Sequence, residues 1–392
     1  MTDAYRVTGS VRLHPRRDLA IRRGHPWVYR GSLAGPLPAG SGPVAVEAAD
    51  GTRLGIALPG ASGGSLALRM VARGEEPWHA ETLRARVIAA AALRELLAID
   101  SDAFRLVHAE GDDLSGLIVD RYGPMAVIEP FEPAWEPYLS DLAATLVGEL
   151  GCRDVAVRRA FGADRRVVAL TGSLPSSPLI IREGQVRFPV DVASGQKTGF
   201  FLDQRDNRRR VAELAAGARV LNLFSYSGGF AVAALVAGAR AAINVDTSRD
   251  ALALAAEACR LNGVNAAPES FRHGDAFEVA RELVASGVHF DIVVVDPPAF
   301  VRRKSEMVSG LRGYKDINLQ ALRLTAPGGL LLTCSCSALV DDAAFGTMLA
   351  AAAGDAGRSV QLLERRGAAA DHPVPLACQE IRHLKAWLCR VS

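Results

Sequence analysis

The sequence predicts an α/β chain whose C-terminal half is a doubly wound, mostly parallel sheet. From about Val190 onward, strand patterns alternate with helical patterns, as in parallel strands joined by crossover helices. Apart from Asp291, residues 290–295 are apolar, which is typical of a strand buried on both faces. Strand patterns at 219–224 and 241–246 each run into a turn and a helix. We expect chemistry at the edge where these strands end.

The length of the chain predicts more than one domain, since 392 residues exceed what one compact core usually organises. Residues 1–74 contain short apolar runs broken by Gly and Pro, which predicts a small β-barrel. Residues 75–188 begin with a helical pattern at 82–99 and end near a second helical pattern at 138–150, with strand patterns between them. They predict a middle α+β domain. Residues 189–392 form the predicted α/β domain.

The composition is that of an ordinary globular protein, with 49% hydrophobic and 22% charged residues. The formal net charge is only +2, so any nucleic-acid binding must come from local clusters of basic residues. The N-terminus lacks the apolar segment of a secretory signal, and we expect a cytoplasmic protein. Residues 220–239 are uncharged and as long as a membrane span, but Asn222 and the turn at 225–229 interrupt them. They predict strand, turn and helix, and no membrane segment.

The cysteines and histidines predict no metal site. No pair of cysteines has the spacing of a zinc site or of a secreted disulfide framework, and no two histidines have the spacing of ligands on one helix. We therefore expect reduced thiols at the six cysteines, which are Cys152, Cys259, Cys334, Cys336, Cys378 and Cys389.

The turn after the first strand of the α/β domain predicts a ligand at a helix N-terminus. The strand at 219–224 runs into Ser-Tyr-Ser-Gly-Gly at 225–229, and the next strand ends in Asp246, about twenty residues later, where doubly wound folds bind a ribose. A dinucleotide would require a fuller Gly-rich loop so that the backbone could approach a pyrophosphate. The missing glycine favours S-adenosyl-L-methionine, which has no phosphate.

Two further residues are expected to flank this ligand. Ser248 follows Asp246 as a predicted helix N-cap, and Asp275 ends the next strand, where its carboxylate could accept a hydrogen bond from the adenine amino group. The alternative is that Asp246 and Asp275 only cap helices. Their joint placement after successive strands favours binding.

The fourth strand delivers Asp-Pro-Pro-Ala-Phe, residues 296–300, to the same edge, and here a family resemblance is plain. The chain resembles the RlmI-like family of bacterial 23S ribosomal RNA (cytosine-5-)-methyltransferases with an N-terminal PUA domain. The resemblance covers nearly the whole chain. The matching segments are residues 24–29, 195–207, 222–230, 296–300, 312–318 and 335–337.

The resemblance implies a PUA barrel, a middle α+β domain and a Rossmann-like class I methyltransferase domain with a mostly parallel seven-stranded sheet. It implies large-subunit ribosomal RNA as the partner and allows a homodimer. The predicted contacts to S-adenosyl-L-methionine are Thr198, Gly199, Asn222, Phe224, Ser225, Tyr226, Gly228, Asp246, Thr247, Ser248, Asp275, Ala276 and Asp296.

Methylation of cytosine at carbon 5 requires a nucleophile, because this carbon reacts only after something adds to the neighbouring double bond. A thiolate can add to carbon 6. Cys334 and Cys336 are two apart and would lie on one face of a continuous strand, so spacing alone does not choose between them. The resemblance favours Cys336, in the family's Ser-Cys-Ser segment, as the nucleophile. Asp296 would then stabilise or protonate ring nitrogen 3, and Cys334 would be core packing.

RNA recognition is expected to begin in the first domain, where basic residues cluster around two aromatic residues, Trp27 and Tyr29. The alternative is that the aromatics belong to the barrel core and the arginines to a solvated face. A second basic run follows the Asp-Pro-Pro turn. The predicted RNA contacts are Arg22, Arg23, His25, Trp27, Pro298, Phe300, Arg302 and Lys304.

Two other functions remain open from the sequence. The Asp-Pro-Pro turn also serves methylation of a base nitrogen, such as one of guanine, without a covalent intermediate. That reaction prefers an aromatic residue directly after the prolines, whereas Ala299 precedes Phe300 here. A non-catalytic RNA-binding assembly factor would be expected to lose Asp296 or Cys336, and both are present.

Overall fold

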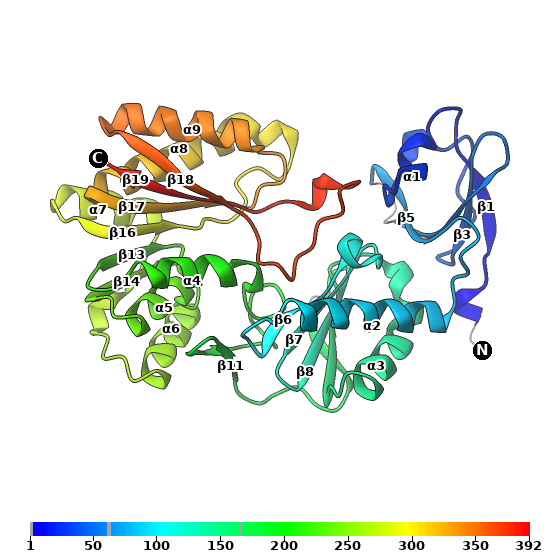
Figure 1. The fold of residues 1–392 in the computed structure, drawn as a ribbon, viewed down its shortest axis with the longest axis horizontal. Coiled ribbons are helices and arrows are strands. Elements are labelled where there is room, and N and C mark those ends of the chain that lie inside the picture. The colour runs from blue at the N-terminus through cyan, green and yellow to red at the C-terminus, as the bar shows by residue number, and fades with distance from the viewer. Residues whose placement is uncertain (1–2, 61–63, 165) are drawn as a thin grey trace. The chain divides into compact units, whose positions relative to one another are not determined.

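The computed structural model describes residues 3–60, 64–164 and 166–392 and is drawn in Figure 1. The chain forms two compact units. The first unit consists of Met1–Leu179, Asp191–Phe200 and Ala370–Ile381. The second unit consists of Ile180–Val190, Phe201–Ala369 and Arg382–Ser392. The predicted boundaries at residues 74/75 and 188/189 stay predictions.

The N-terminal part of the first unit is a five-stranded sheet with the order β1-β3-β4-β5-β2. Strands β1 and β3 run parallel, and the other neighbours are antiparallel. Short apolar strands separated by turns therefore pair as the sequence predicts. The elements are β1 Gly9–Arg12, α1 Leu19–Arg22, β2 Trp27–Tyr29, β3 Val44–Glu47, β4 Arg53–Pro59 and β5 Leu66–Arg73.

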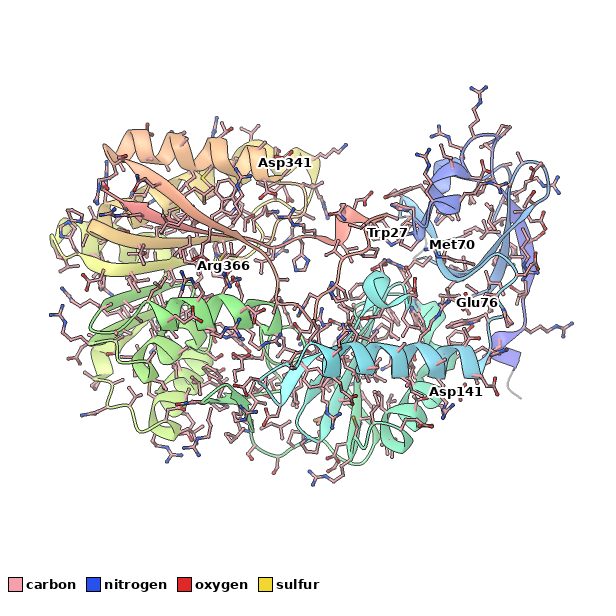
Figure 2. The ribbon with its side chains drawn as sticks, viewed as in Figure 1. Trp27, Met70, Glu76, Asp141, Asp341 and Arg366 are labelled. Carbon is pink, nitrogen blue, oxygen red and sulfur yellow. The ribbon has the colours of Figure 1, made fainter. Side chains whose placement is uncertain are left out.

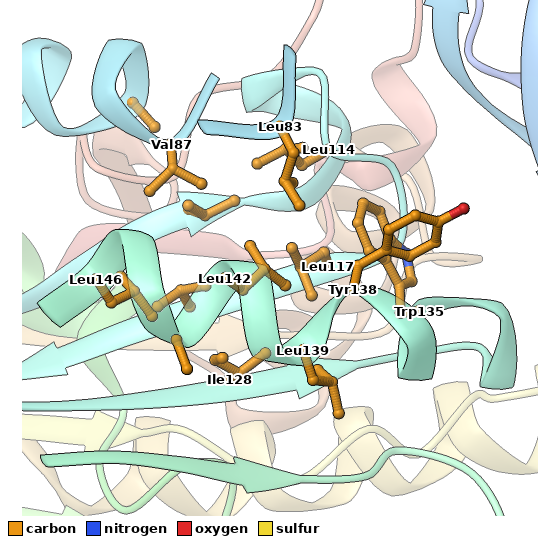
Figure 3. Close-up of a cluster of buried hydrophobic side chains, with 14 of the residues drawn as sticks. Leu83, Val87, Leu114, Leu117, Ile128, Trp135, Tyr138, Leu139, Leu142 and Leu146 are labelled. Atoms are coloured by element: carbon orange, nitrogen blue, oxygen red, sulfur yellow. The ribbon is translucent and has the colours of Figure 1, made fainter. Parts of the chain in front are cut away.

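The first unit contains a second five-stranded sheet, of order β10-β9-β8-β7-β6, with two helices. Leu83 and Val87 from the first helix meet Leu142 and Leu146 from the second in a buried apolar cluster around Trp135 (Figure 3). Both helices were predicted, within a few residues at each end. The elements are α2 Ala80–Leu96, β6 Ala103–His108, β7 Leu117–Tyr122, β8 Met125–Pro130, α3 Leu139–Gly148, β9 Asp154–Arg158 and β10 Val167–Thr171.

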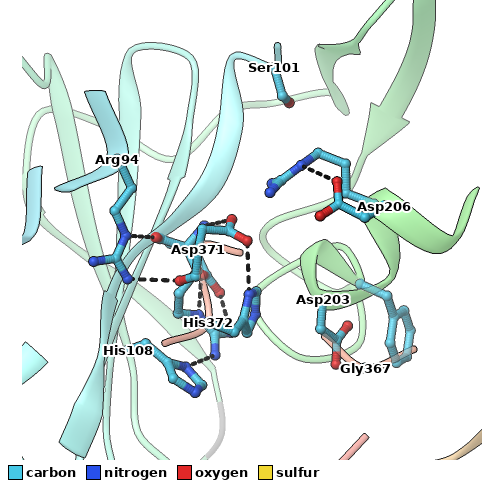
Figure 4. Close-up of polar contacts among 12 residues, drawn as sticks. Arg94, Ser101, His108, Asp203, Asp206, Gly367, Asp371 and His372 are labelled. Atoms are coloured by element: carbon cyan, nitrogen blue, oxygen red, sulfur yellow. Dashed lines mark hydrogen bonds and ion pairs between the residues drawn. The ribbon is translucent and has the colours of Figure 1, made fainter. Parts of the chain in front are cut away.

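Buried charges in the first unit are paired (Figure 4). The Arg94 guanidinium lies 2.6 Å from the Asp112 carboxylate and also donates to the Asp371 carbonyl, at 2.7 Å. Arg105 pairs with Asp120 in the same way, at 2.6 Å. Removing one partner of such a pair leaves a buried charge uncompensated, at a cost of about 3–5 kcal/mol. The bond to Asp371 fixes the 370–381 segment to the first unit.

The second unit is built on a seven-stranded sheet with the order β15-β14-β13-β16-β17-β19-β18, in which β19 is the antiparallel strand. This confirms the predicted mostly parallel sheet. Its strands are β13 Arg219–Leu223, β14 Ala241–Asp246, β15 Phe271–His273, β16 Phe290–Val295, β17 Thr325–Ser335, β18 Val360–Arg366 and β19 Lys385–Val391. A two-stranded sheet, β11 Leu179–Glu183 with β12 Val186–Val190, precedes it.

Helices cover both faces of the seven-stranded sheet (Figure 1). Buried side chains of α4 and α5 form a core with one face, and those of α7, α8 and α9 form a core with the other. The helices are α4 Arg205–Glu213, α5 Gly229–Val236, α6 Arg249–Leu261, α7 Ala276–Ala285, α8 Met307–Leu324 and α9 Asp342–Ala356. Within the described part of the chain, no helix has the length and apolarity that spanning a membrane requires.

Candidate active site

The turn between β13 and α5 has an unusual backbone conformation. Phe224, Tyr226 and Gly228 all have positive φ, at 57°, 47° and 74°. Positive φ is costly for residues with a Cβ and is concentrated at ligand sites. A Cβ on Gly228 would lie 2.7 Å from the Cβ of Ala255 in α6, so this position also requires glycine for space. The turn is therefore held in a specific shape at the carboxyl end of β13.

Asp246 ties this turn to the end of β14. Its Oδ2 accepts a hydrogen bond from the Tyr226 N–H at 2.7 Å, and its Oδ1 accepts one from the Ser248 N–H at 2.9 Å. A carboxylate offers about four lone-pair sites, so two remain for the hydroxyls of a ribose. The geometry fits the predicted role of Asp246.

Three buried polar atoms beside the turn lack a hydrogen-bond partner among the described residues. They are Asn222 Oδ1, Ser225 Oγ and Ser227 Oγ. Each buried polar atom without a partner costs about 1–3 kcal/mol, which a polar ligand can recover. This set fits S-adenosylmethionine, whose amino acid moiety and ribose carry several hydrogen-bonding groups. Ser227 was missed by the sequence prediction, although it lies within the predicted turn.

An aromatic cluster lies at the same edge of the sheet. The ring of Phe224 is 6.0 Å from that of Phe277 and 6.3 Å from that of Phe300, measured between centroids. Phe300 lies 4.7 Å from Tyr314 in α8. Aromatic faces of this kind suit stacking against a planar base. Phe277 and Tyr314 were not predicted as site residues, and they reach this edge from helices α7 and α8.

Asp296 and Cys336 follow two neighbouring parallel strands. β16 ends at Val295, directly before Asp296, and β17 ends at Ser335, directly before Cys336. The Cys336 thiol donates to the carbonyl of Pro297, with Sγ 3.8 Å from the oxygen. Both predicted catalytic side chains are therefore at one edge of the sheet, and both are partly exposed.

The chain resembles known methyltransferases in sequence and in fold. The chain matches the S-adenosylmethionine-dependent methyltransferase family over residues 143–390 and a PUA-like domain over residues 11–70. It is 42% identical over 294 residues to the ribosomal RNA large subunit methyltransferase I of Aeromonas hydrophila, covering 73% of this chain and 74% of the relative. The corresponding protein of Photobacterium profundum is 38% identical over 400 residues, covering 98% of this chain and 100% of the relative.

The chain belongs to the S-adenosylmethionine-dependent methyltransferase family. Its cofactor is S-adenosylmethionine. Among solved structures, the methyltransferase SMU.776 complexed with SAH superposes with a TM-score of 0.87 at 21% identity, covering 97% of this chain and 99% of that one. A SAM-dependent methyltransferase from Streptococcus mutans superposes with a TM-score of 0.86 at 20% identity, with the same coverage. At this identity the superpositions show a shared fold.

The two neighbouring cysteines of this methyltransferase differ in burial. Cys334 is fully buried in the core shared by the sheet and α5. Burial, followed by the charge of Asp296, raises the pKa of Cys334 well above its usual value. Such a thiol stays protonated and inaccessible. Of the six cysteines, only Cys336 is not buried.

The segment after Cys336 is fixed by Ser337, whose role was not predicted. Its hydroxyl accepts from the Val301 N–H at 3.1 Å and lies 2.9 Å from the Tyr314 hydroxyl. Its carbonyl accepts from the Nζ of Lys385 in β19 at 2.9 Å. In the sequence, Lys385 could have been noticed because it is a charged residue at the start of a mostly apolar strand, where lysine is unusual.

Asp275 and Ser248 both act as helix N-caps. Asp275 Oδ1 accepts from the N–H groups of the first turn of α7, and Ser248 accepts from Ala251 N at 3.2 Å in α6. This confirms Ser248 as an N-cap. Asp275 is exposed, and its bonds to the helix use only Oδ1, so an adenine contact through Oδ2 stays a prediction. The same holds for contacts by Thr247, which is exposed, and Ala276, which is buried.

Thr198 and Gly199 belong to the first unit, together with the middle sheet. Thr198 is fully buried and donates to Asp120 Oδ2 at 2.5 Å. Its hydroxyl also lies 2.8 Å from the Tyr122 hydroxyl. These bonds explain the burial of Thr198 without a ligand. The predicted contacts of Thr198 and Gly199 to the cofactor stay predictions.

The predicted RNA contacts of the first domain differ in exposure. Arg22 and Arg23 are exposed, and Arg22 pairs with Asp18 at 2.6 Å. Trp27, labelled in Figure 2, is half-buried, and its indole N–H donates to Glu110 at 2.8 Å. The indole N–H of Trp27 is thus used within the protein. The neighbouring Tyr29 is 41% exposed. In the second unit Pro298, Arg302 and Lys304 are exposed and Phe300 is half-buried.

Three side chains of types that can bind a metal ion lie close together, namely His25, Cys378 and Glu380. Their potential ligand atoms are all within 4.8 Å of one another. The His25 Nδ1 accepts from the Trp27 N–H at 3.1 Å, which leaves the proton on Nε2. That nitrogen lies 3.3 Å from Glu380 Oε1. Burial and neighbouring carboxylates raise the pKa of Cys378 to about 12. The Cys378 thiol is therefore protonated, and the side chains of His25 and Glu380 contact each other.

Proposed function

We propose that this methyltransferase forms 5-methylcytidine in large-subunit ribosomal RNA through a covalent adduct with Cys336. The observation that carries this proposal is the position of Cys336, a partly exposed thiol one residue past β17 and 3.8 Å from the carbonyl that follows Asp296. Its relatives are named ribosomal RNA large subunit methyltransferase I, which supports RNA as the substrate.

S-adenosylmethionine, when bound, supplies an electrophilic methyl group. Asn222, Ser225 and Asp246 would hold it at the carboxyl edge of the sheet, through the polar atoms described above. Cys336 adds to carbon 6 of the cytosine, which makes carbon 5 nucleophilic. Asp296 would stabilise or protonate ring nitrogen 3 of the adduct, and protonation of the ring requires the neutral form of this carboxyl group.

Carbon 5 would take the methyl group as its bond to the sulfonium sulfur breaks, and loss of the carbon-5 proton to a base would then allow Cys336 to leave. The second thiol that other RNA cytosine-5 methyltransferases place directly after the Asp-Pro-Pro turn is replaced here by Ala299. The proton acceptor is therefore a group other than a cysteine at that position.

The exposed arginines of the N-terminal domain would contact the RNA backbone, and Tyr29 would offer a stacking surface. Arg302 and Lys304, which follow the Asp-Pro-Pro turn, would contact phosphates near the target base. The resemblance to the RlmI-like family also extends this proposal to a cytoplasmic enzyme and allows a homodimer.

The test is methyl transfer from labelled S-adenosylmethionine to protein-free ribosomal RNA, followed by nucleoside analysis. The wild type is compared with Cys336→Ala and with Cys334→Ala as the matched control. Labelled 5-methylcytidine that disappears only in Cys336→Ala supports the proposal. Activity that survives Cys336→Ala, or label on a base nitrogen, refutes covalent catalysis and favours nitrogen methylation.

A further inference from the structure

Lys385 is a buried ammonium group without a carboxylate partner. Its side chain is 5% exposed, and Nζ donates to the carbonyls of Ser337 at 2.9 Å and His383 at 3.0 Å. Across residues 3–60, 64–164 and 166–392, no carboxylate lies within ion-pair distance of Nζ. A buried cation is costly unless an anion or several strong acceptors compensate it. Two carbonyl oxygens supply partial charges only.

The backbone places Lys385 beside Cys336. Ser335, the last residue of β17, is the register partner of Lys385 on β19. The Lys385 ammonium then reaches past this pair to the carbonyl of Ser337. Cys336 is the residue between these two points of attachment. The lysine thus holds both ends of the three-residue segment that presents the thiol.

The electrostatic interaction between the two groups favours charge on both. Burial lowers the pKa of Lys385, while Asp342 and then Cys336 raise it. Interactions between titrating groups are reciprocal, so the ammonium favours the thiolate as much as the thiolate favours the ammonium. Asp342 itself forms its ion pair with Arg382, at 3.5 Å.

We propose that Lys385 is a positioning residue that stabilises the thiolate of Cys336 and fixes the loop that carries it. This role rests on the proposed function, because it assigns Lys385 to the activation of the nucleophile named there. A thiol is a poor nucleophile at neutral pH unless positive charge or dipoles favour its ionised form. Lys385 is a buried cation, and it contacts the segment that carries Cys336 through the Ser337 carbonyl.

Other groups around the pair act in both directions. The Cys336 thiol interacts electrostatically with Cys334 and Tyr314, and Cys334 also interacts with Asp296. An ionised Asp296 opposes a thiolate, and the Pro297 carbonyl, which accepts from the thiol, favours its neutral form. The charged groups around Lys385 are Asp341, Asp342 and Arg382. The proposal requires that Lys385 outweigh the opposing groups, which the wild-type titration and the difference between variants both measure.

The experiment is alkylation of the intact, ligand-free protein by iodoacetamide as a function of pH, with mass spectrometry of the peptide that contains Cys336. The other five cysteines are buried, so the reaction reports on this thiol. The variants are Lys385→Met, which removes the charge, and Lys385→Arg, which keeps it. Lys315→Met is the control, because Lys315 is a partly exposed lysine paired with Asp355.

Lys385→Met is expected to raise the apparent pKa of alkylation by about one unit, which lowers the alkylation rate at pH 7 about tenfold. Lys385→Arg is expected to restore most of the shift, and Lys315→Met to titrate like the wild type. In the wild type, the apparent pKa of Cys336 must lie below the value of about 8.5 for a free thiol. This part of the test does not depend on whether the variants fold. A higher wild-type value, or a folded Lys385→Met with an unshifted titration, overturns the proposal.

The assay requires neither RNA nor methyl donor, so its outcome is independent of the base that is methylated. If nucleoside analysis finds no 5-methylcytidine while the thiol titrates with the expected Lys385 dependence, the proposed function fails and the electrostatic pairing stands. If 5-methylcytidine is formed through Cys336 and the titration is insensitive to Lys385, only the role of Lys385 fails.

Discussion

Replacing Gly228 by alanine should destabilise the second unit through two separable effects. Gly228 has a φ of 74°, and left-handed backbone costs a residue with a Cβ about 1–2 kcal/mol. The added Cβ would also lie 2.7 Å from Ala255 Cβ and 3.2 Å from Asn244 Oδ1. Overpacking in a close-packed region costs about 1–3 kcal/mol. The sum predicts a loss of about 2–5 kcal/mol in the free energy of unfolding.

Gly217→Ala is the matched control. Gly217 has a nearly equal φ of 71°, but a Cβ there would meet nothing within 4 Å. It should therefore lose only the backbone contribution of about 1–2 kcal/mol. Urea unfolding of both variants measures the difference, and calorimetry of S-adenosylhomocysteine binding should show weaker affinity for Gly228→Ala only. Equal losses in the two variants would refute the packing of the turn against α6.

Three further substitutions test other contacts. Asp246→Asn should weaken binding of S-adenosylhomocysteine about 10–100-fold in calorimetry, because the ribose would lose charge-assisted acceptors; unchanged affinity would exclude Asp246 from the cofactor site. Ser337→Ala should lower the free energy of unfolding by about 1–3 kcal/mol, with the exposed Ser305→Ala as control. Burial raises the pKa of Glu129, so its charged form opposes folding as pH rises above about 4.5. Glu129→Gln should therefore stabilise the protein in urea at pH 7.5 more than at pH 4.5, and a gain independent of pH would contradict this.

The fold was predictable because its strong signals are local. The largely apolar strand β16 and the alternation of strands and helices were sufficient to predict the mostly parallel sheet. Element ends were less accurate: the predicted strand at 219–224 ends at Leu223, because Phe224 turns to positive φ. The assignment of Asp191–Phe200 and Ala370–Ile381 to the first unit depends on tertiary contacts such as Arg94 with the Asp371 carbonyl. Sequence periodicity carries no information about these.

Candidate site residues that follow the end of a strand could be proposed from the sequence, whereas those that reach the same edge from other elements could not. Asp246 and Asp296 follow directly from the rule that ligands bind at the carboxyl ends of parallel strands. Phe277, Tyr314 and Lys385 reach the same edge from helices and from the antiparallel strand. No spacing in the sequence relates them to the turn, so only the packed structure brings them together.

Cys334 and Cys336 show how the end of a strand can determine the environment of a side chain. Two residues apart on one strand, both thiols would share a face and an environment. The ladder between β17 and β19 stops at the pair of Ser335 with Lys385. Cys334 stays within the ladder and is buried, whereas Cys336 lies one residue beyond it. Because Ser337 then anchors the chain to Val301 and Lys385, the released thiol is held in place. Contacts distant in sequence therefore determine which of the two neighbouring thiols is partly exposed.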